Sequence, residues 1–295
     1  MKNVDYVYLV GAVVCASTSS IFSRFFNNKN GDVKNASSLY SLLVCFAGLI
    51  GWGVLYASDF SFEPLVLLYS LGFGVSFAIV QTGIVNATKT GPVSLSALAS
   101  QLSLIGTTIW GFIFWEDTPN AFSVAGILLV VVALWLCLGS KKKDEEKGIS
   151  FKWLTFAVMA FVGNMGCAIV QKSEQRAFNG AYGNQLMFFA MLFACIVSYV
   201  LYSKNRCENE KSVLRNGYYP TVAGFCSVGL NFCIISMLQG GLETSLIYPT
   251  IAVGGLSLVS LFSAFVFKEK LSWRRWLGIA IGVLAIVLLS IAKEV

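Results

Sequence analysis

The chain has 295 residues, of which 56% are hydrophobic and only 12% are charged, and its mean hydropathy is +0.73. Soluble domains carry about a quarter charged residues, so this chain cannot cover a water-facing surface and the lipid bilayer must be its solvent. Its formal net charge of +6 does not indicate nucleic-acid binding, because no basic face accompanies a soluble fold, and we expect no nucleic-acid partner.

Ten apolar segments are long enough to cross a membrane, since a spanning helix needs roughly 20 mainly apolar residues. In chain order they cover 6–26, 38–58, 63–86, 92–114, 120–139, 151–171, 183–203, 218–239, 244–267 and 273–291. The first follows only Lys2 and has no small-residue cleavage site, which indicates a transmembrane helix rather than a signal peptide. The predicted fold class is an all-α integral membrane protein with ten transmembrane helices.

The two halves of the chain resemble each other. The stretch "FIFWED" at 112–117 has a near-echo, "FVFKEK", at 265–270, and the segments after each also correspond. The most charged connector, "KKKDEEKGIS" at 141–150, lies between the halves. We predict two five-helix repeats, over 1–140 and 151–295, joined by a charged linker at 141–150. Chance similarity between two amphipathic hairpins is the alternative, but it does not explain the distribution of charge.

The basic residues predict how the chain lies in the membrane. Because five is odd, the second repeat would enter from the side opposite to the first, which makes the repeats inverted. Most of the 21 Lys and Arg residues lie in the connectors on one face of this ten-helix arrangement. The positive-inside rule places that face in the cytoplasm, so we expect a multi-pass protein of the cell membrane with both termini outside.

The chain lacks the residues of common catalytic and metal sites. It has no His, and its eight Cys include no C-x-x-C pair. Histidine triads, HExxH zinc sites and histidine proton relays are therefore excluded. All Cys except Cys207 lie inside apolar segments, where they are typical of packing residues rather than disulfides or metal ligands. We expect no catalytic residue, no metal and no cofactor, and hence not an enzyme.

The closing motifs of the halves carry a family resemblance. An F-x-E pattern closes the fourth and ninth segments, Gly126 or Gly278 follows about ten residues later, and "GPVSLSAL" opens the fourth segment. The chain resembles the EamA-type ten-helix transporters of the drug/metabolite transporter superfamily, and its last two segments are similar to the closing pair of small multidrug resistance exporters. The resemblance implies a central cavity enclosed by helices one, three, four, six, eight and nine.

Two departures from these families concern the first helix. Small multidrug exporters carry a membrane-embedded Glu where this chain reads "CASTSSIF", and many EamA proteins carry Trp-Gly where it has Ala16-Ser17. Proton coupling through a buried carboxylate at that place, and recognition of lipophilic cations, are therefore not expected.

Uncharged polar residues are the candidate binding groups, because no charged residue lies near the middle of a predicted helix. Ser96, Ser100, Ser103 and Thr107 share one face of the fourth helix, where such a stripe equally serves close helix packing. Amides are stronger candidates, since an amide without a partner in hydrocarbon is costly. The predicted substrate-binding residues are Ser19, Phe22, Gln81, Ser100, Gln101, Ser103, Asn164, Asn231 and Tyr248. Pro249 can break the ninth helix to form a carrier site, or merely kink it.

These features predict a secondary transporter working by alternating access. A cavity without charge suits a small neutral or zwitterionic metabolite, such as an amino acid, and the resemblance implies export or facilitated diffusion. A proton- or sodium-coupled carrier is the main alternative, and a non-transporting membrane assembly factor or an enzyme is a remote one. The expected partners are the small-molecule substrate and the lipid bilayer, and the expected state is a monomer or homodimer.

Overall fold

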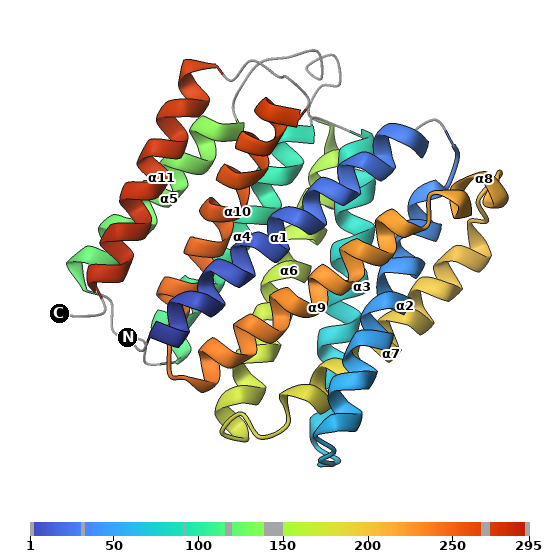
Figure 1. The fold of residues 1–295 in the computed structure, drawn as a ribbon, viewed down its shortest axis with the longest axis horizontal. Coiled ribbons are helices and arrows are strands. Elements are labelled where there is room, and N and C mark those ends of the chain that lie inside the picture. Colours follow the sequence, from blue (N-terminus) through green and yellow to red (C-terminus); the bar gives the residue numbers. More distant parts are fainter. Residues whose placement is uncertain are drawn as a thin grey trace.

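The computed structural model describes residues 3–30, 33–90, 93–115, 120–138, 150–266 and 272–292, and every element in these ranges is a helix (Figure 1). The helices are α1 (Asn3–Asn30), α2 (Ala36–Ser58), α3 (Val66–Thr90), α4 (Val93–Phe114), α5 (Ala121–Leu138), α6 (Phe151–Ala177), α7 (Gly183–Lys204), α8 (Glu210–Arg215), α9 (Tyr218–Gln239), α10 (Thr244–Val266) and α11 (Trp273–Ala292). Most of the predicted linker, and the Glu of each F-x-E pattern, lie outside these ranges.

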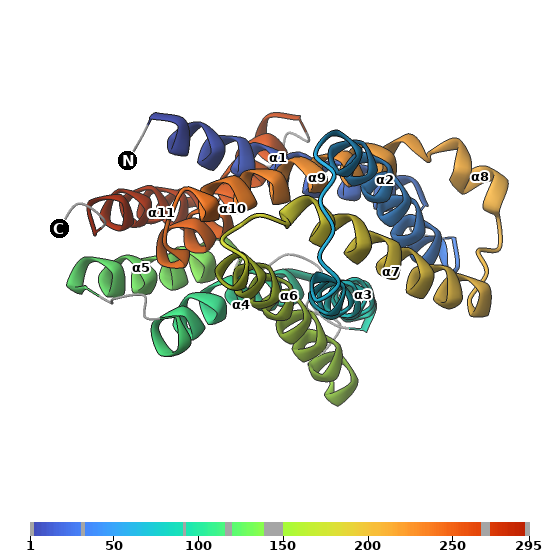
Figure 2. The ribbon, with the colours of Figure 1, turned by 90° about the horizontal axis from the view of Figure 1, so that it is seen from below.

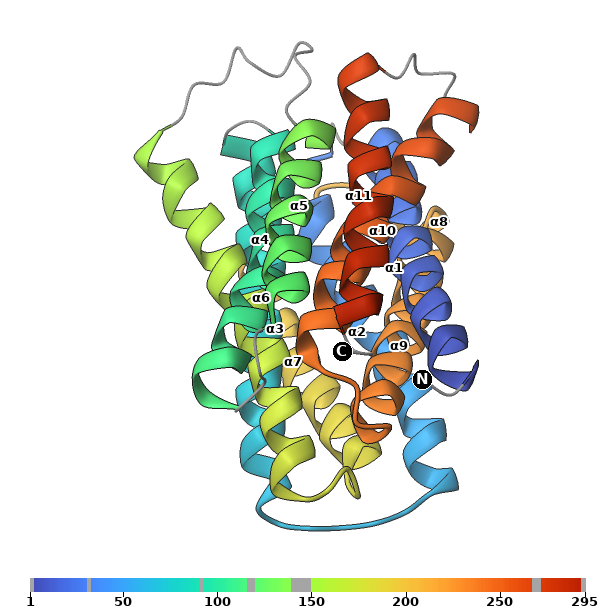
Figure 3. The ribbon, with the colours of Figure 1, turned by 90° about the vertical axis from the view of Figure 1, so that its left-hand side faces the viewer.

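The predicted all-α membrane class with ten long helices is confirmed. Seven helices are long and apolar enough to cross a membrane, and α4 and α5 contain the shorter apolar stretches Leu98–Phe114 and Ala121–Cys137. The long helices run side by side (Figure 3). Both termini lie toward the end that carries the α2–α3 and α6–α7 connections (Figures 1 and 3).

Three helices continue further than the apolar pattern predicts. They are α1, α3 and α6, which end at Asn30, Thr90 and Ala177, whereas the apolar segments end at 26, 86 and 171. Extending an existing helix needs only residues compatible with one, because the costly nucleus has already formed. The polar residues at these ends therefore join the helices, and in α6 they bring Glu174 into the buried interior.

Helices from the two halves of the chain interleave. The most extensive contacts join α3 with α6, α5 with α11, α1 with α9, and α7 with both α2 and α3. Seen from below, α5 and α11 lie at one edge of the bundle, while α2, α7 and α8 lie at the other (Figure 2). The core between these edges therefore belongs to α1, α3, α4, α6, α9 and α10.

Glycines set the closest of these contacts, between α3 and α6. A Cβ added at Gly83 in α3 would lie 2.5 Å from the Ala160 backbone nitrogen of α6. A Cβ added at Gly163 in α6 would lie 2.8 Å from the Val80 nitrogen of α3. The two backbones thus touch directly, as small residues allow between helices in lipid.

We predict that Gly83→Ala lowers the free energy of unfolding by about 1–3 kcal/mol, because the new methyl group forces α3 and α6 apart. Thermal unfolding of the purified protein in detergent measures the effect. The matched control is Gly72→Ala, also in α3, whose Cβ would meet only the Val170 side chain at an ordinary 3.5 Å. Equal stability of the two variants would contradict the direct contact between backbones.

Candidate functional site

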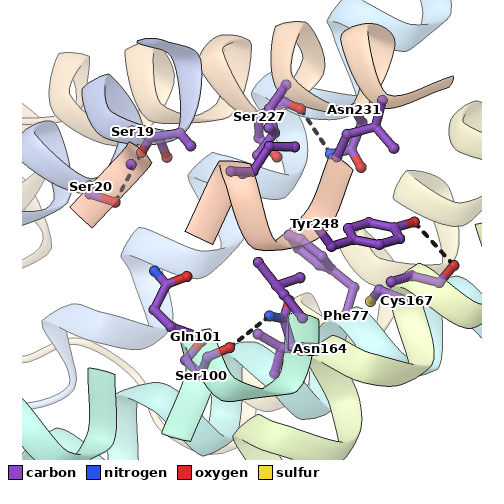
Figure 4. Close-up of a pocket in the computed structure, with 18 of the residues that line it drawn as sticks. Ser19, Ser20, Phe77, Ser100, Gln101, Asn164, Cys167, Ser227, Asn231 and Tyr248 are labelled. Atoms are coloured by element: carbon purple, nitrogen blue, oxygen red, sulfur yellow. Dashed lines mark hydrogen bonds between the residues drawn. The ribbon is translucent and has the colours of Figure 1, made fainter. Parts of the chain in front are cut away.

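A cavity of about 450 Å³ lies in the centre of the bundle (Figure 4). Its lining comes from α1, α3, α4, α6, α9 and α10. These are the helices that the family resemblance implies, because α8 is a short connecting helix and the eighth and ninth predicted spanning helices are α9 and α10. No charged residue is among the lining residues that the structure describes. The polar residues of the lining are Ser19, Ser20, Ser100, Gln101, Asn164, Gln171, Ser227, Asn231 and Tyr248.

The amide of Asn164 in α6 is held in place by α4. Its Nδ2 donates to the carbonyl oxygen of Ser100 at 3.1 Å and to the Ser103 hydroxyl at 2.7 Å. The Ser103 hydroxyl donates in turn to the Ser100 carbonyl oxygen at 2.5 Å. Both N–H groups of the amide are thereby used, so its carbonyl oxygen is the group that can accept a hydrogen bond from a bound molecule.

Two further polar groups are fixed by the backbone. Asn231 in α9 donates to the Ser227 carbonyl oxygen of its own helix at 2.9 Å, which leaves its second N–H and its carbonyl oxygen for the cavity. Tyr248 in α10 is buried, and its hydroxyl reaches the Ala168 carbonyl oxygen of α6 at 3.5 Å. Amides from facing helices thus converge on one space (Figure 4).

Six of the nine predicted site residues line the cavity: Ser19, Ser100, Gln101, Asn164, Asn231 and Tyr248. Ser103 lies directly behind the lining, where it is fully buried and bonded to Asn164. It therefore orients a lining residue and does not itself border the cavity.

The other two predicted residues lie elsewhere. Phe22 packs against Phe25 and Tyr219, near the ends of α1 and α9. Gln81 borders a second cavity of about 210 Å³ between α2, α3 and α7, together with Asn86. Gln81 does not border the central cavity because its neighbour Val80 does. Each helical residue is turned about 100° from the one before, so the Gln81 side chain points away from the central cavity.

The list of predicted site residues omitted Gln171, Ser227 and Ser20, which also line the cavity. The signal for Gln171 was available, because it follows Asn164 by seven residues and therefore shares its face of α6. The signal for Ser227 was similar, since it precedes Asn231 by one helical turn.

The packing around the cavity is tighter at one end. Every residue of α10 from Thr244 to Gly255 is buried, whereas those at 256–262 are half-buried or exposed. We call the end at which α10 begins the packed end of the cavity, and the end at which α10 finishes the loose end. Pro249 lies inside the packed half, and α10 continues through it, so of the two alternatives left open by the sequence the structure shows no break in this helix.

No family model matches the chain. An uncharacterised protein of Haemophilus influenzae is 24% identical over 288 residues, which cover 94% of this chain and 95% of that protein. A probable glucose uptake protein, GlcU, of Priestia megaterium is 24% identical over 253 residues, covering 79% of this chain and 82% of the relative. The glucose uptake protein GlcU of Bacillus subtilis is 25% identical over 236 residues, covering 77% and 76%.

The fold also has a match among solved structures. One crystal structure aligns with 100% of this chain and 99% of its own chain, with a TM-score of 0.77 and 14% sequence identity. At this identity the match speaks for the fold alone. The chain is a multi-pass helical membrane protein distantly related in sequence to the GlcU glucose uptake proteins.

Proposed function

We propose that this chain is a secondary transporter that carries a small, neutral molecule rich in hydroxyl groups, of the size of a monosaccharide, across the cell membrane. The observation that carries the proposal is the central cavity, whose polar lining consists of amides and hydroxyls from five helices, α1, α4, α6, α9 and α10. Its volume of about 450 Å³ lies in the usual range for small-molecule sites. The relatives named as glucose uptake proteins support both transport and this class of substrate.

The chemistry of the lining favours a neutral substrate over the amino acid expected from sequence. Sugar hydroxyls both donate and accept hydrogen bonds, and amides such as those of Gln101 and Asn231 offer both functions. Phe73 and Phe77 line the same cavity and supply apolar surface for the carbon face of a sugar ring. An amino acid would instead bring two full charges against a lining without a charged partner, which costs free energy.

The two inverted five-helix repeats are part of the proposal, and the helix pairs support them. In two such repeats, α1 to α5 correspond in order to α6, α7, α9, α10 and α11. When each helix is replaced by its counterpart, the α1–α9 pair becomes the α6–α3 pair, and the α2–α9 pair becomes the α7–α3 pair. The α2–α7 and α5–α11 pairs exchange with themselves. All of these pairs pack against each other, as two similar halves would require. Such halves can rock against one another around a central site.

The packing along α10 suggests which way the cavity faces. We infer that this form opens at the loose end and is closed at the packed end. The described connectors at the loose end carry basic residues such as Lys34, Arg206 and Arg215, and the positive-inside rule makes this end cytoplasmic. Alternating access then requires a second form in which the packed end opens outward. The names of the relatives favour uptake over the export expected from the family resemblance.

Transport by purified protein in proteoliposomes tests the proposal, with labelled glucose and other monosaccharides measured in both directions. We expect exchange of at least one monosaccharide, and no exchange by empty vesicles. Exchange of amino acids without sugars would overturn the substrate class, and no exchange across either panel would overturn the transport proposal.

We predict that Asn231→Ala weakens binding of the transported sugar by about 5- to 30-fold, because one or two hydrogen bonds in the cavity are lost. Equilibrium binding to the detergent-solubilised protein measures the change. The control is Asn86→Ala, which removes an amide with the same bond to its own helix, 2.9 Å to the Thr82 carbonyl oxygen, but outside the central cavity. Equal losses in both variants would contradict the assignment of the site.

We predict that a thiol at the loose end of α10 reacts faster than one at the packed end. In a variant without the eight native Cys, Val259→Cys and Ser245→Cys place thiols on nearly the same face of α10, about 21 Å apart. Val259 borders the cavity, whereas Ser245 is buried. A membrane-impermeant reagent applied to inside-out vesicles should modify Val259→Cys at least about tenfold faster, because thiol reactivity follows access. Comparable rates would contradict the assignment of the open end.

A further inference from the structure

One buried acidic residue, Glu174, has no part in the proposed substrate site. Its side chain is fully buried (0% exposed), near the end of α6. It follows Gln171, which lines the cavity, by three residues, so the two side chains lie on neighbouring positions of one helix face. Because α6 ends on the side where α10 begins, Glu174 lies about one helical turn beyond the cavity, at its packed end (Figure 1).

The hydrogen bonds of this group are incomplete. Glu174 Oε2 accepts from Gln175 Nε2 at 3.3 Å, whereas its Oε1 has no hydrogen-bond partner. The Gln171 Nε2 and Gln175 Oε1 atoms also lack partners, and both side chains are more than nine-tenths buried. Three neighbouring side chains of α6 therefore present unsatisfied polar atoms in the interior. Such groups are costly unless something binds them.

No cation in the described part of the chain forms an ion pair with Glu174. The titratable or charged residues on the elements around this end of α6 are Glu63, Tyr69, Tyr182, Cys233, Glu243 and Tyr248, with Lys172 and Arg176 on α6 itself. Arg176 donates to the Trp115 carbonyl oxygen, and Glu243 accepts from the Ser245 hydroxyl at 2.9 Å. An ionised carboxylate would thus be dehydrated without a compensating charge, which is strongly unfavourable.

A proton fits this place better than a metal ion. Hard cations take about six oxygen ligands, but the unpartnered oxygens here are those of one carboxyl and one amide. A protonated carboxyl group is neutral and gains a donor, which suits a site with an unpartnered amide oxygen close by in the sequence.

We propose that Glu174 is a proton-binding site that controls closure of the packed end of the cavity. As this end closes, the Glu174 carboxylate takes one proton from water on that side and becomes a neutral, buried acid. As the end opens, water reaches the group and the proton returns to it. Gln171 joins this site to the cavity, since it borders the cavity and neighbours Glu174. The inference rests on the alternating access of the proposed function and adds to it a dependence on pH.

Linkage gives the direction of the effect. The closed form binds one proton more than the open form, so acid favours closure and alkali favours opening, by up to about tenfold in the equilibrium per pH unit. A thiol placed at Ser245 can report this equilibrium, because Ser245 is buried at the packed end in this form and we expect it to become accessible when that end opens.

The experiment measures modification of Ser245→Cys from mildly acidic to mildly alkaline pH, in backgrounds with Glu174, Glu174→Gln and Glu63→Gln. At each pH the rate is divided by that in the Glu174→Gln background, which cancels the ionisation of the thiol itself. We expect this ratio to rise at least about tenfold with pH. Glu63→Gln is the matched control, because it makes the same chemical change before α3 at the same end of the bundle, and it should behave as the parent does.

A ratio that does not change with pH would overturn the role of Glu174, whether or not sugars are transported. A ratio that rises with pH in sodium chloride but not in a salt of an organic cation would mean that Glu174 binds a metal ion and not a proton. If Glu174→Gln does not fold, the modification rate of Ser245→Cys is divided by that of Val259→Cys in the parent at each pH. The Glu174→Asp variant must then show the same dependence of this ratio on pH. Failure of sugar exchange with an intact pH dependence would count against the substrate alone.

Discussion

The structure depends on one constraint: inside a bilayer, a polar group finds no water, so it must bond within the protein or face a cavity. Several hydroxyl groups of the described helices meet the constraint within their own helix, as Thr82 does by donating to the Ala78 carbonyl oxygen. Amides cannot all do so, because each carries two N–H groups and a carbonyl oxygen. Four of them, Gln101, Asn164, Gln171 and Asn231, border the central cavity, and their places largely define the candidate site.

Packing and site are connected through α6. Gly163 brings the α6 backbone against Val80 and Ser76 of α3, and the next residue, Asn164, is turned by about 100° toward α4. There it meets Ser100 and Ser103. A larger residue at Gly163 would move α6 away from α3 and displace the amide as well. The close approach of two backbones thus fixes the position of a polar group that borders the cavity.

The sequence predicts the fold better than the site for a physical reason. Ten helices follow from hydropathy, because lipid demands long apolar segments. The facing of each helix does not follow, since side chains toward lipid and toward protein are equally apolar. Gln81 and Gln101 therefore look alike in sequence, although only Gln101 borders the central cavity. The sequence gives no indication of buried Glu174 for another reason. The polar residues around it are typical of a connector, but in the structure they continue α6.

The separation of the cavity from Glu174 has a functional consequence. The lining of the cavity is uncharged, so the affinity for a neutral substrate needs no charged group and changes little with pH. Glu174, the one buried carboxyl group among the residues that the structure describes, follows Gln171 by about one turn and does not line the cavity. In the proposed mechanism, recognition and control are thereby carried by different residues of one helix. We then expect substitutions at Asn164 to act on what is bound, and those at Glu174 to act on when the packed end opens.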